Sequence, residues 1–318
     1  MELSLVVLMQ TLVMFTLMLV GFVLVKSRVL TDGGIRQLSS LLMTVVMPAL
    51  MIDSCQLTFD RERLLGFFFA LLLALLAHLV HIAIATPLYY RGNPSFDQGM
   101  STFCCIYSNA GFMGLPLIQA SLGEEALFYA AAYLVVFNLF SWTHGVMVLR
   151  CQKKLGGLRE LAGLAKNPGV IGVAVGLLLF FCRILLPSPL GPALHYVASM
   201  NTPVAMLICG ALIAASDFRR LLRDRHIYLV SFVKLLAAPA ACILLYKLLR
   251  LDTLLPDAGY LMMINIIAAA CPTAVSASVL PSRYGLKGEY GSQIVSVSTL
   301  LSVLTLPLVV LIAGWAFP

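Results

Sequence analysis

Long apolar stretches follow one another along the whole chain, and the first of them, Leu3 to Val25, contains no Asp, Glu, Lys or Arg. About 20 such residues in a helix are enough to cross the hydrocarbon layer of a bilayer. The stretch is too long for the apolar core of a signal peptide, so it predicts a first membrane span. Hydrophobic residues make up 61% of the chain and charged residues 11%, which excludes an ordinary soluble domain. Because lipid cannot hydrogen-bond to exposed backbone, we expect an all-α integral membrane protein.

Ten apolar runs of this kind can be placed along the chain. Five precede and five follow a basic segment, residues 150–167, which predicts a short cytoplasmic linker and leaves no room for an inserted soluble domain. The chain therefore divides into residues 1–149, the linker 150–167 and residues 168–318. The predicted spans are residues 3–25, 37–55, 64–88, 99–122 and 125–149, then 168–187, 191–215, 227–249, 259–283 and 290–316.

The basic residues are distributed unequally between the loops. Fifteen of the 21 Lys and Arg residues lie in odd-numbered loops and five in even-numbered ones. The positive-inside rule then places odd loops in the cytoplasm and both termini outside the cell membrane. Topology explains the formal charge of +7, so the bilayer is an expected partner and nucleic acid is not.

The two halves carry hints of a repeat. An odd number of spans per half means that two related halves would be inserted upside down relative to each other, as in many transporters. The segment Met47–Met51 resembles Thr202–Met206, and a shift of about 162 positions sets Ala110 against Pro272 and Gly123 against Gly285. Such matches also arise by chance in apolar sequence, but together with the span count they predict two inverted five-helix repeats.

The fourth span contains the run Ser108–Pro116, with two glycines, a proline and an amide, which is incompatible with an unbroken helix. From a cytoplasmic start near Gly99, Asn109 lies about 15 Å deep, at the bilayer midplane. The ninth span enters from the other side and reaches Cys271–Thr273 after a similar rise. We therefore expect helices four and nine to be broken and to cross at the midplane.

Broken backbone in hydrocarbon leaves N–H and C=O groups that protein, water or ligand must satisfy, so these breaks predict a binding site. If helices restart near Gly114 or Pro116 and near Pro272, their N-termini would attract a carboxylate. A simple proline kink would explain any one of the prolines alone. The predicted substrate-binding residues are Asn109, Gly111, Gly114, Pro116, Asn201, Cys271, Pro272 and Thr273, with Ser108, Pro48, Pro203, Lys234, Asn138 and Asn265 as additional candidates.

Several of these residues have two interpretations. Lys234 lies about 10 Å inside span eight, where its amine either snorkels to the headgroups or acts as a functional cation. Asp53 lies near the outer end of span two, which favours an interfacial or capping role over proton coupling. Asn138 and Asn265 either touch ligand or hydrogen-bond neighbouring helices.

The residue patterns give no sign of catalysis or of a cofactor. The eight cysteines form no Cys-x-x-Cys pair, and His78 and His81 have no third ligand nearby in sequence, so no metal site is expected. There is no Gly-x-Ser-x-Gly, no His-Glu-x-x-His and no intramembrane Asp pair. We expect no cofactor and no enzyme activity.

The run Asn109–Pro116, followed by Gly123–Leu127, resembles the fourth-span signature of the auxin efflux carrier family, within the wider bile acid and auxin carrier-like superfamily. Other segments that look like this family are Lys166–Pro168, Asn201–Pro203, Lys234–Pro239 and Cys271 to Gly285.

The resemblance implies inverted five-helix repeats whose broken helices cross in a transport domain that moves against a scaffold domain. It also implies small organic anions as substrates, indole-3-acetate in plant members and malate or malonate in bacterial relatives. Carried onto this chain, the crossover would be Asn109–Pro116 with Cys271–Thr273, and Asn201 would lie in the cavity. Plant members often have a long central loop, so the short linker 150–167 favours a bacterial-type member in a plasma membrane. A homodimer is compatible with the family, although no residue pattern here indicates one.

Two other functions use the same features. An anion channel could be built on a polar midplane, although opposed broken helices suit a site exposed alternately to each side. A membrane sensor on the same fold would bind the anion without moving it. The sequence leaves the substrate, the direction (export is favoured) and the coupling ion open.

Overall fold

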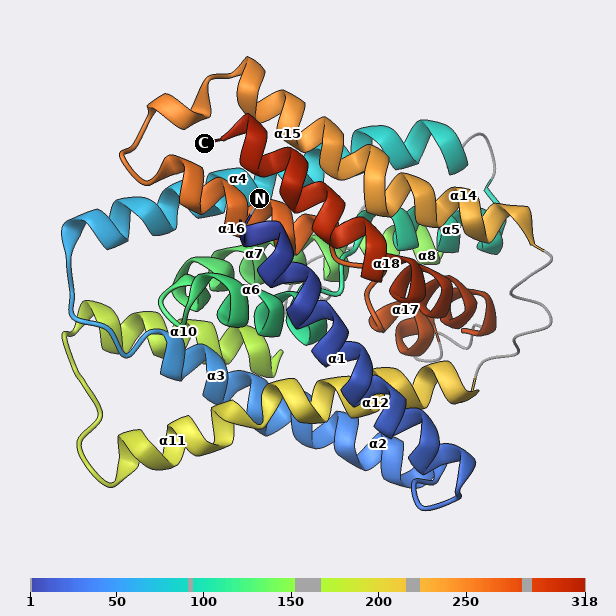
Figure 1. Cartoon of the computed structure of the whole chain (residues 1–318), viewed down its shortest axis with the longest axis horizontal. Helices are drawn as coiled ribbons and strands as arrows, with labels where there is room; N and C mark the ends of the chain where they lie inside the picture. Colours follow the sequence, from blue (N-terminus) through green and yellow to red (C-terminus); the bar gives the residue numbers. More distant parts are fainter. Residues whose placement is uncertain (1, 91–93, 152–166, 216–223, 282–287, 318) are drawn as a thin grey trace.

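The computed structural model describes residues 2–90, 94–151, 167–215, 224–281 and 288–317, and within these ranges it contains helices, one isolated β-bridge and no β-strand (Figure 1). Seven helical segments are long and apolar enough to cross a membrane, and three further apolar helices are shorter. Eight of the ten predicted spans coincide approximately with one of these segments, whereas each of the predicted spans 99–122 and 259–283 contains one of the shorter helices and a break. The all-α prediction is therefore confirmed for the described residues, while most of the predicted linker, residues 152–166, lies outside them.

In the part of the first half that the structure describes, eight α-helices and three π-helical turns follow one another in the order of the sequence. They are α1 (Glu2–Lys26), α2 (Asp32–Leu41), η1 (Leu42–Val46), α3 (Met47–Ser54), α4 (Arg61–Tyr89), α5 (Phe96–Ile106), η2 (Ala110–Gly114), α6 (Leu115–Leu122), α7 (Ala126–Phe140), η3 (Ser141–Gly145) and α8 (Val146–Leu149). The second half contains α10 (Pro168–Phe181), α11 (Leu190–Ser199), α12 (Asn201–Ala215), α14 (Arg225–Phe232), η4 (Val233–Ala237), α15 (Ala238–Leu248), η5 (Leu251–Thr253), α16 (Ala258–Ala270), α17 (Ser276–Val279) and α18 (Glu289–Ala316).

Polar residues just before the helices explain where several of them begin. Asp60 accepts a hydrogen bond from the second residue of α4, and Asp224 does the same for α14. Ser95 and Gln98 form a reciprocal capping box at α5. Asn167 caps α10, whose first residue is a proline. Each cap satisfies backbone N–H groups that have no partner inside the helix.

A π-helical turn precedes three of the intramembrane prolines at the same spacing. The turn η1 ends two residues before Pro48, η2 two residues before Pro116, and η4 two residues before Pro239. Proline has no N–H, and its ring collides with the carbonyl four residues back, which a wider turn avoids. The chain therefore remains helical through Pro48, and the helix break of span four lies before Pro116 rather than at it.

The most extensive helix contact joins α1 to α12, which cross as shown in Figure 1. Glycines make this close approach possible. A Cβ atom at Gly21 would collide with the carbonyl of Leu207, and one at Gly210 would collide with the carbonyl of Met18. Small residues bring helix backbones together in membranes because dispersion contacts, not the hydrophobic effect, hold helices against each other there.

We expect Gly210→Ala to destabilise the fold by about 1–3 kcal/mol, because the added methyl forces α1 and α12 apart. Gly314→Ala in α18 is the matched control, since no described atom lies within 4 Å of the methyl it would add. Thermal unfolding of the detergent-purified variants measures the difference. Equal melting temperatures for the two variants would contradict the close α1–α12 packing.

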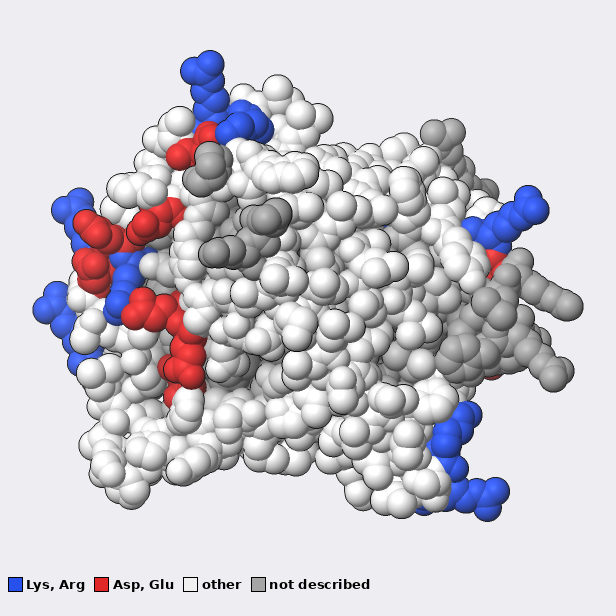
Figure 2. Space-filling model, viewed as in Figure 1, with Lys and Arg blue, Asp and Glu red and all other residues white. Residues whose placement is uncertain are grey.

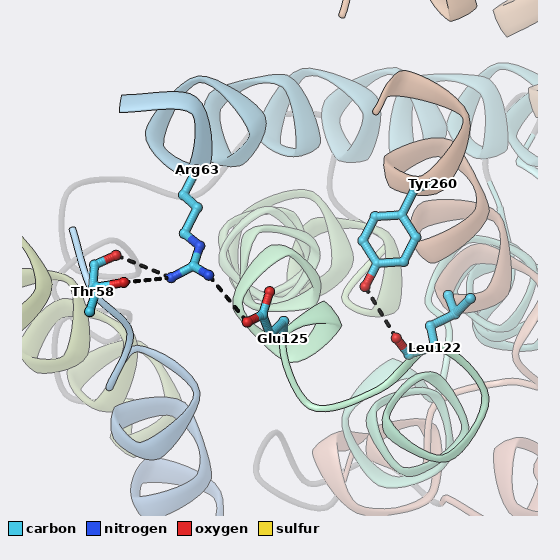
Figure 3. Close-up of polar contacts among 5 residues, drawn as sticks. All are labelled: Thr58, Arg63, Leu122, Glu125 and Tyr260. Carbon is cyan, nitrogen blue, oxygen red and sulfur yellow. Dashed lines mark hydrogen bonds and ion pairs between the residues drawn. The ribbon is translucent and has the colours of Figure 1, made fainter. Parts of the chain in front are cut away.

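Charged side chains gather at two ends of the molecule, and the face drawn in Figure 2 has a broad belt between them that lacks Lys, Arg, Asp and Glu. This distribution matches a bilayer surrounding the belt. At one end Arg63 bonds to Glu125 across 3.1 Å and to Thr58, and the Tyr260 hydroxyl donates to the Leu122 carbonyl at 3.2 Å (Figure 3). These contacts join α4, α7, α6 and α16 where the predicted external loops lie.

Two further ion pairs lie at or near the predicted external ends of the spans. His195 contacts Asp53 at 3.0 Å, and Lys247 donates to Asp252 at 2.9 Å, which lowers the pKa of that carboxyl group. Asp53 is thus paired at the surface end of α3, as its predicted interfacial role requires.

Candidate functional site

The fourth predicted span is interrupted at residues 107–109. Helix α5 ends at Ile106, Tyr107 is extended, and helical structure resumes at Ala110. The carbonyl of Asn109 accepts from the N–H groups of both Met113 and Gly114, at 3.0 and 3.1 Å. The predicted restart near Gly114 or Pro116 is therefore wrong, because the π-turn η2 already forms the first turn of the helix that continues to Leu122.

The ninth predicted span is interrupted after α16. Cys271 leaves the helix with ψ 150°, Pro272 has no N–H to continue it, and α17 begins at Ser276. The break itself is present, but helical structure resumes four residues later than predicted.

The two interruptions lie against each other and pair through their backbones. Ser108 and Thr273 form an isolated antiparallel bridge. The N–H of Asn109 donates to the Pro272 carbonyl at 2.7 Å, and the N–H of Ala274 donates to the Tyr107 carbonyl at 2.9 Å. Each break therefore satisfies backbone groups of the other in an interior where unpaired groups are costly.

The side chains at the bridge also bond across it, each to the helix that precedes the other break. The Ser108 hydroxyl donates to the Ala269 carbonyl at 3.0 Å, near the end of α16, and the Thr273 hydroxyl donates to the Cys104 carbonyl at 3.0 Å, near the end of α5. Both carbonyls belong to helix ends, where intrahelical donors are missing. The N–H of Thr273 in turn donates to Ser298 of α18 at 3.2 Å. We call these paired breaks, residues 107–109 and 271–274, the seam.

Lys234 points into the seam and is fully buried. Its Nζ atom donates to the Ser108 hydroxyl and, at 3.1 Å, to the Ala269 carbonyl. The snorkelling interpretation is therefore wrong, because the amine lies inside the protein at the C-terminal end of α16. Helix C-termini carry partial negative charge, which favours a cation at this place.

Two histidines of α4 that the sequence analysis did not connect with this region are buried beside it. The His81 Nδ1 atom lies 3.2 Å from the Ile106 carbonyl, at the end of α5, and 3.5 Å from Lys234 Nζ. His78 packs against the rings of Tyr133 and Phe140, with centroid distances of 4.9 and 5.6 Å. The sequence did contain a signal for these two histidines, because ionisable residues inside a membrane span usually mark functional sites.

The remaining residues predicted for the two breaks lie close to the seam. Asn109 Nδ2 contacts Cys209 Sγ of α12 at 3.9 Å. A Cβ at Gly114 would lie 3.2 Å from Cys271 Sγ, and one at Gly111 would lie 2.9 Å from the Met47 methyl. Pro116 is buried in the first turn of α6. The two glycines therefore allow the 110–122 helix to lie close to its neighbours.

The residues predicted from the second and seventh spans are placed differently. Asn201 begins α12 and is buried, and its Oδ1 has no hydrogen-bond partner among the described residues. It precedes Cys209 by eight residues, a rise of about 12 Å along the helix. Pro203 is exposed, and Pro48 packs against Gly172 of α10. The structure therefore does not bring these three residues into the seam.

Asn138 and Asn265 have protein partners. Asn138 donates to the Leu134 carbonyl at 2.8 Å and accepts from Asn167, the cap of α10, at 3.0 Å. Asn265 accepts from the Tyr246 hydroxyl at 2.8 Å. These bonds tie helices together, as polar residues do in membrane proteins.

We expect Thr273→Val to lower the free energy of unfolding by about 1 kcal/mol, because the buried Cys104 carbonyl loses its hydroxyl donor. Thr305→Val is the matched control, since the Thr305 hydroxyl bonds to the Leu301 carbonyl of its own helix on the exposed side of α18. Thermal unfolding in detergent compares them. An equal effect in both variants would show that the seam does not depend on this bond.

Comparisons with known proteins indicate membrane transport. The model of a family described as "Membrane transport protein" matches residues 6–160 and 157–310. A Rhizobium meliloti (strain 1021) protein named "Putative malonate transporter" is 26% identical over 247 residues, covering 74% of each chain. A Methanothermobacter thermautotrophicus protein named "Uncharacterized transporter" is 24% identical over 297 residues, covering 92% of this chain and 93% of the other. The Escherichia coli (strain K12) protein named "Uncharacterized transporter YfdV" is 25% identical over 205 residues, 62% of each chain.

Proposed function

The chain belongs to the membrane transport protein family, and we propose that within this family it is a secondary transporter of small organic anions that works by alternating access at the seam. The family membership confirms the resemblance to auxin efflux carriers, and with it a role in membrane transport. The observation that carries the anion proposal is the buried amine of Lys234 at two paired helix breaks.

The charge of the seam supports an anionic substrate. Lys234 is buried, whereas no Asp or Glu of the described residues is buried. A buried ammonium without a carboxylate partner is costly, and a carboxylate ligand would supply the missing countercharge. The 110–122 helix adds donors, because the N–H groups of its first residues have no partner within the helix and Asn109 makes no side-chain cap there.

The hydrogen bonds of the seam also support inverted repeats, with residues 1–149 and 168–318 as the two halves and 150–167 as the linker. A shift of 165 positions pairs Tyr107 in the first half with Pro272 in the second, and Asn109 with Ala274. When each residue is replaced by its counterpart, the bond from Asn109 to Pro272 becomes the bond from Ala274 to Tyr107, and the reverse. The shift likewise converts the Ser108 bond into the Thr273 bond. The same shift aligns Pro116 with Pro281, Gly123 with Gly288 and Glu124 with Glu289. This register replaces the predicted shift of 162.

Inverted halves suit alternating access, because a site at their interface is equivalent with respect to the two sides of the membrane. Helices four and nine would cross at the seam, near the bilayer midplane. The start of α1 and the end of α18 both lie toward the left in Figure 1, where α3 connects to α4. Because the α3–α4 connection is a predicted external loop, this arrangement supports placing both termini outside, and the proposed membrane is a bacterial plasma membrane.

The proposed size of the substrate is based on the family and on the name of one relative. Malonate and malate are compact dicarboxylates, and one relative carries malonate in its name. The proposed substrate class is therefore small carboxylates, dicarboxylates before auxin-like aromatic acids, with export as the proposed direction.

Counterflow in proteoliposomes tests the proposal, with malonate, malate and indole-3-acetate as the anions. We expect saturable exchange of at least one of them. Asn109→Ala is expected to lower the exchange rate at limiting substrate at least tenfold, which corresponds to the loss of one charge-assisted hydrogen bond worth about 1.4 kcal/mol. Gln37→Ala, which removes an amide from an exposed position of α2, is the control and should leave exchange unchanged.

Each other outcome has a defined meaning. Saturable binding without exchange would favour a sensor, and conductance far above carrier rates would favour a channel. Full exchange in a folded Asn109→Ala protein would remove that residue from the site.

A further inference from the structure

Lys234 and His81 form a buried pair of basic side chains with no acidic partner among the described residues. Their nitrogens Nζ and Nδ1 lie 3.5 Å apart, and both side chains are almost completely buried. The pair joins η4 of span eight to α4 of span three. It sits directly on the seam, because Lys234 also bonds to Ser108 and the Ala269 carbonyl.

The surroundings of the pair are neutral in their ordinary ionisation states. The neighbouring titratable groups are an imidazole, a phenol and four thiols, namely His78, Tyr133, Cys104, Cys105, Cys242 and Cys271. The other charged or titratable residues on the helices packed on η4 lie near the ends of those helices. They are Asp97 of α5, Arg225, His226 and Tyr228 of α14, Tyr246 and Lys247 of α15, Tyr260 of α16, and Glu289 and Tyr290 of α18. Two adjacent cations in this interior would repel each other strongly, so the pair holds one extra proton at most.

The His81 Nδ1 atom cannot serve both of its neighbours at once. It lies 3.2 Å from the Ile106 carbonyl, which needs an N–H donor, and 3.5 Å from Lys234, which as an ammonium needs a lone pair. When Lys234 is charged, Nδ1 accepts from it and the Ile106 carbonyl loses this donor. When Lys234 is neutral, an Nδ1–H group can cap the Ile106 carbonyl at the end of α5. The proton on the pair therefore changes the hydrogen bonding of the first break.

We propose that Lys234 and His81 form the proton-binding site that couples anion movement to the proton gradient. This inference rests on the proposed function. The anion binds when Lys234 holds its proton, because the ammonium supplies the countercharge. After the anion leaves, the ammonium gives the proton to water on the same side, and the empty carrier returns with a neutral pair. One proton thus travels with each anion in the same direction, and the ammonium balances one carboxylate of the anion. Export in this cycle runs down the outward gradient of the anion and carries the proton out with it, whereas an acid exterior drives the same cycle toward uptake.

The test measures net uptake of radiolabelled malonate, or of whichever anion shows counterflow, into proteoliposomes with the membrane potential clamped at zero. We expect a gradient of one pH unit, acid outside, to drive about tenfold accumulation, the ratio that one coupled proton per anion gives. A pH-sensitive dye inside the vesicles should record about one proton entering per anion.

Variants separate coupling from binding. Lys234→Arg keeps a cation that cannot release its proton, so counterflow falls severalfold but persists. Accumulation driven by the pH gradient and proton entry are lost, because the empty carrier cannot return in the neutral form. His81→Gln, which removes the shared nitrogen, should also lower the number of protons per anion. Lys247→Arg, at a half-exposed position paired with Asp252, is the matched control and should leave both readouts unchanged.

The possible failures are distinguishable. Absence of counterflow for every anion would overturn the proposed function itself. Counterflow without pH-driven accumulation or proton entry in the unmodified protein would overturn only the coupling inference. Accumulation at the unmodified level in Lys234→Arg would show that another group carries the proton. If Lys234→Arg does not fold, the dye measurement on the unmodified protein still tests whether protons enter with the anion, and the His81→Gln variant still tests whether this pair carries them.

Discussion

Backbone hydrogen bonding in an apolar interior is the constraint on which the rest of this structure depends. A chain that crosses a membrane must pair nearly every N–H and C=O group within the protein, and the seam is where helices alone cannot do so. Two breaks meet there, and each supplies hydrogen-bond partners to the other, through Asn109 with Pro272 and Ala274 with Tyr107. A seam built in this way is held by few bonds, so we expect a change in any one of them to alter its geometry.

The side chains around the seam also satisfy backbone groups at the ends of the broken helices. Ser108 and Thr273 each bond to a carbonyl at the end of the opposite broken helix, and Lys234 and His81 reach the ends of α16 and α5 from the preceding spans. The groups that hold the breaks together are therefore also the groups that can respond to charge. In our proposal, anion binding and proton binding act on one set of bonds, which is why a single site can link substrate, proton and conformation.

Much of this arrangement could be predicted from the sequence. Long apolar runs and loop charges gave the ten helical segments, and the Gly- and Pro-rich motifs gave the two breaks. The register within the breaks could not be read in this way, because a π-turn before Pro116 and a longer extended segment after Pro272 depend on partners distant in sequence. Lys234 had two interpretations because burial is a property of the packed helices. His81 was missed because its role appears only when α4 lies beside the end of α5.

The most direct test of the central claim, that the seam is a substrate site reached from each side in turn, uses the native thiol of Cys271. Membrane-impermeant thiol reagent would be applied from either side of oriented proteoliposomes, with and without the transported anion, and modification of Cys271 would be followed by peptide mass spectrometry. Our account predicts modification from both sides and a lower rate in the presence of the anion. A Cys271 that reacts from neither side, or at a rate that the transported anion does not change, would contradict it.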